Sequence, residues 1–286
     1  MSSVERQCPM SAEAKDFGIW TLVAGLVFAL ALISLTACKP NLIQTTKQIT
    51  VAAAADLGPA FDEIGRAFEA ESRTKVIFSF GSTGMLTQQI ENGAPMDVFA
   101  AADVSYIDQL ERKGFIVSGT RAIYALGRIT IWTRKTAALK PQQLAELTRP
   151  EVKRIAIANP GHAPYGLAAR QALEAAGVWD EVKPKLIYGD NIRQALQFAQ
   201  TGNVDVAIVA LSLSLPSDGY WVLIPAELHK PLNQGLGVVK GTAHESDARN
   251  FASFVNSAAG RKIMQKYGFT LPGDEPVPQA SAQASP

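Results

Sequence analysis

Few side chains in this sequence could do chemistry. Histidine occurs three times, at His162, His229 and His244, and no pair has the HxH or HExxH spacing of a zinc site. We therefore expect surface histidines rather than metal ligands. The loop Gly81-Ser82-Thr83-Gly84 follows an apolar run, but it lacks the G-x-S-x-G spacing of a hydrolase nucleophile and the lysine of a P-loop.

Two aspartates, Asp97 and Asp103, flank a predicted strand and could act as an acid and base pair. Each is as easily a turn or helix-cap residue. This inventory predicts that the protein is not an enzyme. One catalytic alternative stays open, a hydrolase that uses the Ser82/Thr83 loop as its nucleophile.

Four junctions at which a predicted strand passes into a predicted helix indicate a different chemistry. All four are rich in small residues, and they cover residues 51–59, 80–84, 159–166 and 189–193. The first turn of a helix carries N–H groups without partners and about half a positive charge. Four such turns that converge would present roughly +2 to an anion without any lysine or arginine. One junction alone is only what any α/β protein needs at a turn.

The composition is compatible with a small anionic ligand. The 286 residues include 27 Lys+Arg and 26 Asp+Glu, so the net charge is +1, and 47% of the residues are hydrophobic. This balance argues against a nucleic-acid binder and against a disordered chain. It does not exclude a dianion that is held by amides and hydroxyl groups.

The first 37 residues are predicted to be a leader. Residues 18–37, GIWTLVAGLVFALALISLTA, carry no charge and are long enough to span a bilayer. Leu35-Thr36-Ala37 directly before Cys38 resembles the lipobox of bacterial lipoproteins, so we expect lipidation of Cys38 after cleavage. The alternatives are a retained transmembrane anchor and a soluble periplasmic form. All three place the body outside the cytoplasm, and because the other cysteine is Cys8, no disulfide is expected in the body.

Between a tether at 38–46 and a disordered tail at 272–286, the body alternates strands with helices. This alternation predicts an α/β fold of parallel strands covered by helices. The predicted strands begin at Ile49, Lys75, Val98, Arg128, Ile155, Lys185, Val206 and Gly235. The predicted helices include one through Phe61, Ile64 and Phe68, and others at 85–91, 105–113, 142–147, 165–176, 192–200, 246–256 and 260–267.

Longer motifs resemble the molybdate-binding proteins that deliver oxyanion to bacterial ABC transporters. The likeness runs from about Ile49 to Leu271. It is carried by VAAAADL at 51–57, GSTGMLTQQIENGAPMDVFAAAD at 81–103, ANPGHAPYGLAARQAL at 158–173, DNIRQAL at 190–196 and KYGFTLP at 266–272. The second string is long and specific. The NPGHAPYG motif, together with Ala210 where other members have a tyrosine, is similar to one subgroup of the family.

The resemblance implies a two-lobed, periplasmic-binding-protein-like fold, in which each lobe is an α/β sheet. Lobe 1 would comprise residues 47–126 and 231–271, and lobe 2 residues 127–230. Two strands that cross near 125–128 and 227–234 would join the lobes. A tetrahedral molybdate or tungstate would lie between them, held mainly by backbone N–H groups. The implied ligand-binding residues are Ala55, Asp56, Ser82 and Thr83 in lobe 1, and Tyr165 and Ile192 in lobe 2.

The resemblance also implies the partners. The chain has no Walker motif, so the energy for transport would come from an ABC permease and its ATPase subunit. We expect no cofactor, no direct cation ligand, membrane attachment through Cys38 and a monomer. The alternative within the same class is a binding protein for phosphate, sulfate or an organic anion.

Asp56 departs from the family pattern, which commonly has Ser or Asn at this position. A carboxylate 4 Å from an anionic charge costs on the order of 4 kcal/mol at an effective dielectric constant of 20. We therefore expect the Asp56 carboxylate to turn away and cap the helix that begins near Gly58, so that only its amide faces the anion. We expect the nearby Arg193 to be solvated rather than to contact the anion.

Overall fold

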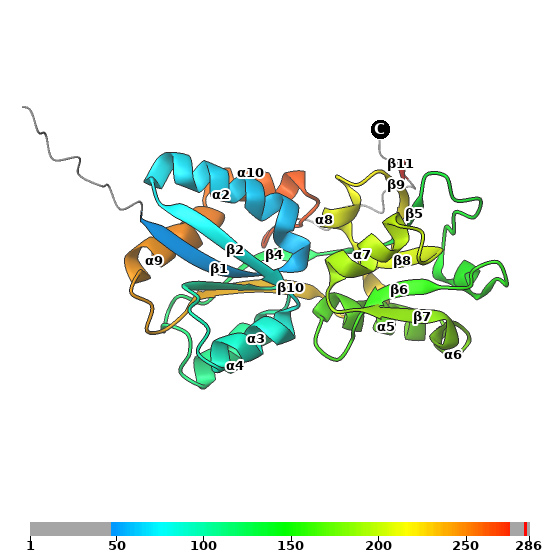
Figure 1. Cartoon of the computed structure of the whole chain (residues 1–286), viewed down its shortest axis with the longest axis horizontal. Helices are drawn as coiled ribbons and strands as arrows, with labels where there is room; N and C mark the ends of the chain where they lie inside the picture. The colour runs from blue at the N-terminus through cyan, green and yellow to red at the C-terminus, as the bar shows by residue number, and fades with distance from the viewer. Residues whose placement is uncertain (1–46, 275–282, 285–286) are drawn as a thin grey trace, which may run out of the picture. The chain divides into compact units, whose positions relative to one another are not determined.

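The protein is described by a computed structural model that covers residues 47–274 and 283–284. Within these ranges the chain forms two β-sheets, each with helices packed on both faces (Figure 1). The predicted α/β class is confirmed. The predicted alternation of strands and helices is also confirmed for most elements.

The first sheet has the strand order β2-β1-β3-β10-β4. Its strands are β1 (Gln48–Ala54), β2 (Lys75–Gly81), β3 (Val98–Ala101), β4 (Ala122–Gly127) and β10 (Leu232–Val238). β1 pairs in parallel with β2 and β3, while β10 runs antiparallel to β3 and β4. Because β10 comes from late in the chain, the first sheet is assembled from two separate segments.

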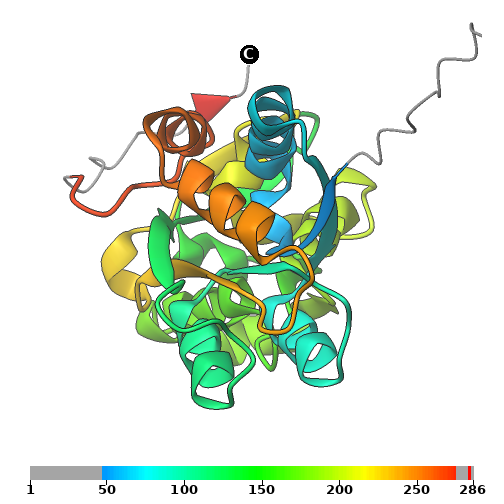
Figure 2. The same ribbon diagram turned by 90° about the vertical axis from the view of Figure 1, so that its left-hand side faces the viewer.

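Helices cover both faces of the first sheet (Figures 1 and 2). One face carries α2 (Gly58–Ser72), α9 (Glu245–Val255) and α10 (Ala258–Lys266), and the other carries α3 (Thr83–Glu91) and α4 (Val104–Arg112). The predicted apolar stripe of α2 is buried. The ring of Phe251 in α9 packs edge-on against Phe61 and Phe68, with centroids 6.0 and 5.3 Å apart. These aromatic contacts join the early and late segments of the chain.

The second sheet has the order β11-β9-β5-β8-β6-β7. Its strands are β5 (Ile129–Arg134), β6 (Ile155–Ala158), β7 (Leu186–Gly189), β8 (Val206–Ala210), β9 (Gly219–Leu223) and β11 (Gln283–Ala284). β6 is parallel to β7 and β8, and β5 is antiparallel to β8 and β9. The chain passes from the first sheet to the second at Arg128, between β4 and β5, and returns between β9 and β10.

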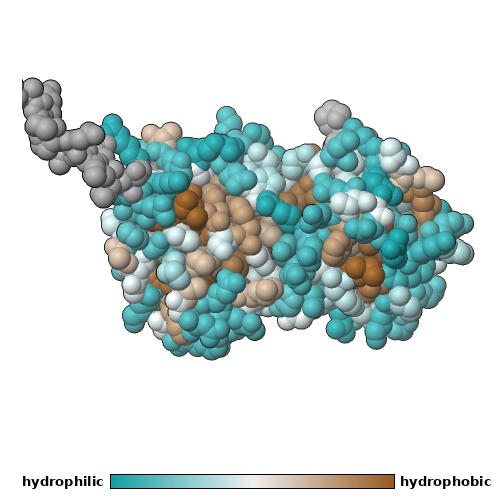
Figure 3. Space-filling view, viewed as in Figure 1, coloured by the Kyte–Doolittle hydropathy of each residue, from teal (hydrophilic) through white to brown (hydrophobic). Residues whose placement is uncertain are grey.

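The second sheet is covered mainly by α5 (Pro164–Ala175) on one face and α7 (Ile192–Gln200) on the other (Figure 1). Short helices complete it, namely α6 (Trp179–Val182) and α8 (Leu211–Ser214). The described residues also contain single 3₁₀ turns: η1 (Ala55–Leu57), η2 (Leu144–Thr148), η3 (Lys183–Lys185) and η4 (Ala226–Leu228). The surface in view is largely hydrophilic, with hydrophobic areas over the edge strands β2 and β7 (Figure 3).

The predicted elements differ from the structure in a few places. α3 begins at Thr83 rather than Met85, because Ser82 is extended and acts as the N-cap residue. The helix predicted at 142–147 is only the 3₁₀ turn η2. β4 and β9 were not predicted, and both lie close to the points at which the chain crosses between the sheets.

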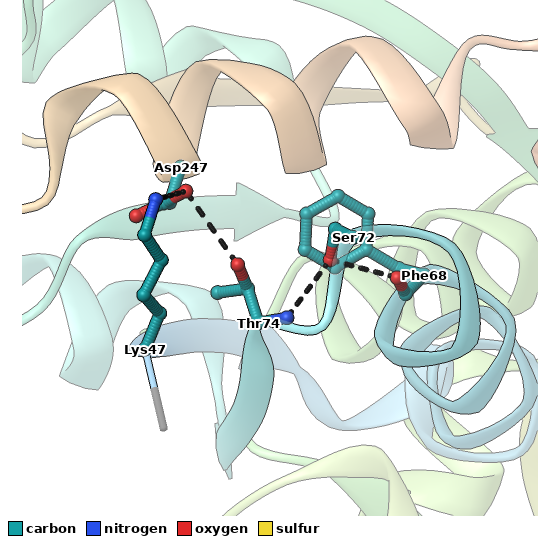
Figure 4. Close-up of polar contacts among 5 residues, drawn as sticks. All are labelled: Lys47, Phe68, Ser72, Thr74 and Asp247. Carbon is teal, nitrogen blue, oxygen red and sulfur yellow. Dashed lines mark hydrogen bonds and ion pairs between the residues drawn. The ribbon is translucent and has the colours of Figure 1, made fainter. Parts of the chain in front are cut away.

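The connection between α2 and β2 is fixed by a small set of polar contacts (Figure 4). α2 ends at Arg73, which has a left-handed conformation with φ 59°. The Ser72 hydroxyl donates to the Phe68 carbonyl at 2.8 Å and accepts from the Thr74 amide at 3.1 Å. Asp247 of α9 accepts from both the Thr74 hydroxyl and the Lys47 ammonium at 3.5 Å. The late helix α9 therefore also binds the start of the body.

Several predictions concern residues outside the described ranges. The leader 1–37 with its lipobox, the tether 38–46 and residues 275–282, 285 and 286 of the tail belong to this group. Gln283–Ala284 of the tail pairs antiparallel with β9. Within the described part of the chain, no helix has the length and apolar character needed to cross a membrane. The lobe limits 47–126 with 231–271 and 127–230 stay predictions.

Candidate functional site

A small cavity lies where elements of the first sheet meet elements of the second. Its volume is about 10 Å³, close to the least space that holds one water molecule. All six residues that the resemblance implies as ligand-binding line it together: Ala55, Asp56, Ser82, Thr83, Tyr165 and Ile192. Ala54, Gly81, Ala102, Ala163 and Pro164 complete the wall. The wall thus contains no lysine, arginine or histidine.

The six residues are closed off from solvent. None is more than 4% exposed, and Asp56 and Thr83 are each 1% exposed. A ligand larger than a water molecule would therefore need the elements of the two sheets to move apart before it could enter.

The first-sheet side of the wall consists of η1 and the start of α3. Ala55 and Asp56 lie in η1, which runs directly into α2. Thr83 begins α3, and its hydroxyl oxygen accepts a hydrogen bond from the Ala102 amide at 3.1 Å. The Thr83 hydroxyl hydrogen can therefore be donated to another acceptor. Ser82 makes no side-chain capping bond to α3, so its hydroxyl is not used by the helix.

On the second-sheet side, the first turn of α5 leaves one amide for the cavity. Pro164 has no N–H group. The amides of Gly166 and Leu167 donate to the Ala163 carbonyl at 2.9 and 3.0 Å. The Tyr165 amide is the remaining first-turn donor, because helix geometry gives it no partner within α5.

The start of α7 has the same property. Its N-cap residue Asn191 accepts hydrogen bonds from the amides of Arg193 and Gln194 at 3.0 and 3.1 Å. The Ile192 amide is left as the first-turn donor at the cavity wall. The hydrophobic side chain of Ile192 thus does not prevent the residue from binding an anion through its backbone.

The positive field at the cavity comes from backbone dipoles. Three α-helices, α3, α5 and α7, begin at residues in or next to the wall. At about half a charge each, they contribute roughly +1.5. The prediction that the first junction also exposes the N-terminus of an α-helix is wrong. This junction forms the single 3₁₀ turn η1 before α2 begins. One turn aligns fewer peptide dipoles than a full helix, so its contribution is smaller.

Several hydrogen bonds cross between the two sides of the cavity, among them the bond that Gln234 Nε2 of β10 donates to the Tyr165 hydroxyl of α5 at 2.9 Å. The Gly84 amide of α3 donates to the His162 carbonyl at 2.9 Å. The Ser82 hydroxyl and His162 Nδ1 lie 2.8 Å apart and share a hydrogen bond. The Ser212 hydroxyl of α8 donates to the Asp56 carbonyl at 2.8 Å. These contacts hold the cavity in the enclosed arrangement.

The Asp56 carboxylate does not cap a helix, so the predicted capping role is wrong. Neither η1 nor α2 has a side-chain capping hydrogen bond. Asp56 Oδ2 instead accepts from Gln234 Nε2 of β10 at 2.6 Å, and the same nitrogen donates to the Tyr165 hydroxyl at 2.9 Å. Gln234 Oε1 accepts from the Tyr124 hydroxyl at 2.9 Å. Gln234 draws the carboxylate toward β10 because its side-chain amide is completely buried and needs acceptors.

Burial perturbs the acid groups of this network. It raises the pKa of Asp56 to about 6, although hydrogen bonds from Gln234 and Tyr165 and the residue's own amide act in the opposite direction. Asp56 Oδ1 is buried and has no hydrogen-bond partner. Burial and the Asp56 charge also raise the pKa values of Tyr165 and Tyr124 well above the ordinary tyrosine value. Both tyrosines are therefore neutral hydrogen-bonding groups at physiological pH.

The other candidate residues lie outside the cavity wall. Asp103 caps α4 by accepting from the Ser105 amide at 2.8 Å, and Asp97 accepts from the Thr50 amide at 2.6 Å. Asp103 therefore has the helix-cap role that we gave as its alternative, whereas Asp97 links β1 to a distant segment of the chain and is neither a turn nor a helix-cap residue. His244 is exposed, whereas His229 is only 8% exposed, so the expected surface position is wrong for His229. Within the described ranges, no group of His, Cys, Asp and Glu could hold a metal ion.

Sequence reasoning missed three residues that organise the site: His162, Ser212 and Gln234. His162 was taken as a surface histidine, but it contacts Ser82 and Gly84 across the cavity. Its place in the third junction, two residues before α5, was a usable signal. Ser212 and Gln234 lie in segments that no junction motif marks, so nothing local in the sequence indicated them.

Two β-sheets with covering helices enclose a small cavity at the N-termini of helices. This arrangement is typical of binding proteins that hold a small solute between two sides. The family described as bacterial extracellular solute-binding protein matches residues 49–270, and the chain belongs to this family. The resemblance stated from the sequence motifs is confirmed at the level of the family and the fold.

Particular members of known function are similar over most of their length. The chain is 35% identical over 229 residues to the molybdate-binding protein ModA of Azotobacter vinelandii, covering 78% of this chain and 90% of that protein. It is 30% identical over 237 residues to ModA of Escherichia coli, covering 81% and 92%. The solved structure of the Azotobacter vinelandii periplasmic molybdate-binding protein matches with a TM-score of 0.73 at 28% identity, covering 78% of this chain and 99% of that one. The sulfate-binding protein SubI of Mycobacterium tuberculosis, with a TM-score of 0.68 at 19% identity, shares the fold.

Proposed function

We propose that the protein is an extracytoplasmic binding protein that captures molybdate or tungstate between two lobes and delivers it to an ABC importer. The lobes are the elements around the first sheet and those around the second. The observation that carries the proposal is the cavity wall, which has helix N-termini and hydroxyl groups but no basic side chain. The similarity to molybdate-binding proteins at 30–35% identity supports the choice of ligand.

The anion would be held by neutral donors from both lobes. The amides of Ala55, Asp56 and Thr83, with the Ser82 and Thr83 hydroxyls, would bind it from the first lobe. The amides of Tyr165 and Ile192 would bind it from the second. Hydrogen bonds to an ionised acceptor are roughly twice as strong as those between neutral groups. A fully ionised tetrahedral dianion can satisfy many such donors at once.

Protonation and size would decide between anions. Hydrogen phosphate carries a proton that needs an acceptor, and Asp56 has the only carboxylate on the wall. Phosphate therefore stays an alternative ligand. Sulfate has no proton, so only a cavity matched to a larger anion discriminates against it.

Release and transport would need the lobes to part about the two crossings of the chain. The bonds from Ser82 and Gly84 to His162, from Ser212 to Asp56 and from Gln234 to Tyr165 would break in the open form. The permease and its ATPase subunit would be the partners that receive the anion. The binding protein itself would act as a monomer without a cofactor.

The binding proposal is tested by calorimetric titration of the purified protein at neutral pH with molybdate, tungstate, sulfate and phosphate in turn. We expect molybdate and tungstate to bind with submicromolar dissociation constants, and sulfate and phosphate to bind far more weakly. If both molybdate and tungstate bind no more tightly than micromolar, the proposed ligand is wrong. A preference for phosphate would favour the alternative ligand, with the Asp56 carboxylate as the acceptor of the phosphate proton.

Gly84 is expected to be required for closure over the anion. A Cβ atom at this position would lie 2.8 Å from the His162 carbonyl oxygen and 2.9 Å from its Cβ. Crowding of this kind costs about 1–3 kcal/mol, so Gly84→Ala should weaken molybdate binding roughly 10- to 100-fold. The control is Gly161→Ala in the loop that contains His162, where the new Cβ meets only the Asn159 side-chain oxygen at 3.2 Å. Equal affinities for the two variants would show that the α3–His162 contact is not part of the bound state.

A hydrolase is the second candidate, because the Ser82 hydroxyl and His162 Nδ1 lie 2.8 Å apart. A catalytic pair of this type needs a third group that orients the histidine. In the part of the chain that the structure describes, no carboxylate is hydrogen-bonded to His162. The contact is therefore better explained as a link between the lobes. Turnover of acyl or phosphoryl esters that is lost in Ser82→Ala would support the hydrolase instead.

The membrane attachment rests on the sequence alone. Lipidation of Cys38 would place the binding protein at the outer face of a membrane, close to its permease. Cys38→Ser should then release the protein from the membrane fraction. A variant that remains in that fraction would favour the retained anchor at residues 18–37.

A further inference from the structure

Asp56 puts a carboxylic acid on the wall of a cavity that is otherwise suited to anions. Asp56 is 1% exposed, and only one of its two carboxylate oxygens has a hydrogen-bond partner. We propose that capture of the oxyanion is coupled to uptake of one proton by Asp56, so that the loaded protein carries this carboxyl group in its neutral form. The inference rests on the proposed function and assigns a regulatory and selective role to a residue of the same site.

No neighbouring side chain can neutralise the Asp56 charge from within the site. The groups that surround it are Tyr165 of α5, Tyr124 of β4, Gln234 of β10 and Ser212 of α8. Both tyrosines stay neutral because burial raises their pKa values.

The cation that approaches from α7 is Arg193. Its guanidinium group lies close to Gly58 and over the ring of Phe80, with its carbon 5.1 Å from the ring centroid. Among the residues that the structure describes, Arg193 and Asp56 form no ion pair, and Arg193 is exposed. Solvent therefore screens most of its effect on a buried carboxylate.

A bound anion would shift the protonation equilibrium of the Asp56 carboxyl group. Burial in the enclosed structure raises the Asp56 pKa to about 6, so without an anion beside it the group is mainly ionised at neutral pH. A dianion on the same wall disfavours the ionised carboxylate further and raises this pKa again. The proton comes from solvent, bonds to a carboxylate oxygen and leaves when the anion leaves. Asp56 Oδ1, which has no partner, can accept it without breaking the bond between Oδ2 and Gln234.

The sign of the pH dependence follows from linkage. Below the pKa of the empty protein, Asp56 is protonated whether or not the anion is bound, and the affinity is independent of pH. Between the pKa of the empty form and the higher pKa of the loaded form, each unit of rising pH should weaken binding up to tenfold. An anion that brings its own proton, such as hydrogen phosphate, needs no uptake and should show a smaller dependence.

The test is calorimetric titration with sodium molybdate between about pH 6 and pH 9, in pairs of buffers with different ionisation enthalpies. The buffer dependence of the heat counts the protons taken up. For the wild-type protein we expect uptake that approaches one proton near neutral pH, and a dissociation constant that rises with pH. This measurement needs no variant, so it stands even if a substituted protein does not fold.

The matched variant is Asp56→Asn, which keeps an oxygen for Gln234 but cannot ionise. It should bind molybdate with no proton uptake and little pH dependence, and at about pH 8 at least tenfold more tightly than the wild type. A second variant, His162→Gln, removes the histidine that is hydrogen-bonded to Ser82 on the wall, and it should keep the wild-type pH profile. A profile lost in His162→Gln but kept in Asp56→Asn would overturn the assignment to Asp56.

The outcomes separate the two proposals. If molybdate binds tightly to wild type and Asp56→Asn alike, with no proton uptake and the same affinity at every pH, the proton coupling is wrong and the proposed function stands. If neither molybdate nor tungstate binds either protein at any pH, the proposed function fails and the coupling fails with it.

Discussion

Replacing Thr83 by aspartate is expected to abolish oxyanion capture, with a loss of affinity of roughly 1,000-fold. Thr83 is the first residue of α3 and lines the cavity. An aspartate carboxylate there could still accept the Ala102 amide hydrogen bond that the Thr83 hydroxyl accepts at 3.1 Å. Its negative charge would lie at the positive N-terminal end of α3, where it would interact with the helix dipole in place of the anion and repel the anion. The affinity is measured by calorimetric titration with molybdate.

The matched control is Thr83→Asn, which has nearly the same size and the same acceptor but no charge. The difference between the two variants isolates the electrostatic part of the effect. If aspartate and asparagine at this position weaken binding equally, the cavity does not hold an anion. A loss that is confined to aspartate and is reduced at high salt would agree with a site built on backbone dipoles.

Asp56→Asn is expected to stabilise the empty protein at neutral pH. Burial raises the pKa of Asp56 from 3.8 to about 6, so ionising this group costs more in the folded state than in the unfolded chain. About two pKa units correspond to about 3 kcal/mol. Because the Asp56 side chain is almost completely buried, solvent screening takes little from this value.

The raised pKa of Asp56 makes the stability of the wild-type protein fall as the pH rises. Below about pH 4 the carboxyl group is protonated in both states, and its titration contributes nothing. Between about pH 4 and pH 6 the folded protein keeps a proton that the unfolded chain loses, so the wild-type stability falls as the pH rises. The asparagine variant lacks this loss. In urea titrations without oxyanion, its advantage in free energy of unfolding should grow by about 3 kcal/mol from pH 4 to pH 7. An advantage that is the same at both pH values would contradict the buried charge.

The hydrophobic pattern was sufficient to predict most of the fold. The spacing of Phe61, Ile64 and Phe68 predicts the buried face of α2, and the apolar run at 206–209 lies in β8. Such segments bury one face or both faces in the core, so their period is visible in the sequence. β4 and β9 lie next to the crossings between the two sheets, where the pattern is less regular, and these strands were missed.

The candidate site was predictable to the extent that its residues lie in the junctions between strands and helices. The amides of Thr83, Tyr165 and Ile192 come to one cavity because parallel strands of each sheet end on the same side. Whether these amides bind an anion stays a prediction. The partner of Asp56 could not be predicted, because Gln234 is far away in the sequence and is brought to Asp56 only by the antiparallel strand β10. The capping hypothesis considered local partners alone, and a tertiary contact replaced them.

The proposed binding mode depends most on the position of the anion. The most direct measurement is an X-ray structure of the protein crystallised with sodium molybdate, with data collected at the molybdenum absorption edge. We expect one anomalous peak in the cavity, with anion oxygens about 2.7–3.2 Å from the amide nitrogens of Thr83, Tyr165 and Ile192. A peak that lies only among surface lysine and arginine side chains, with no molybdenum in the cavity, would contradict the account.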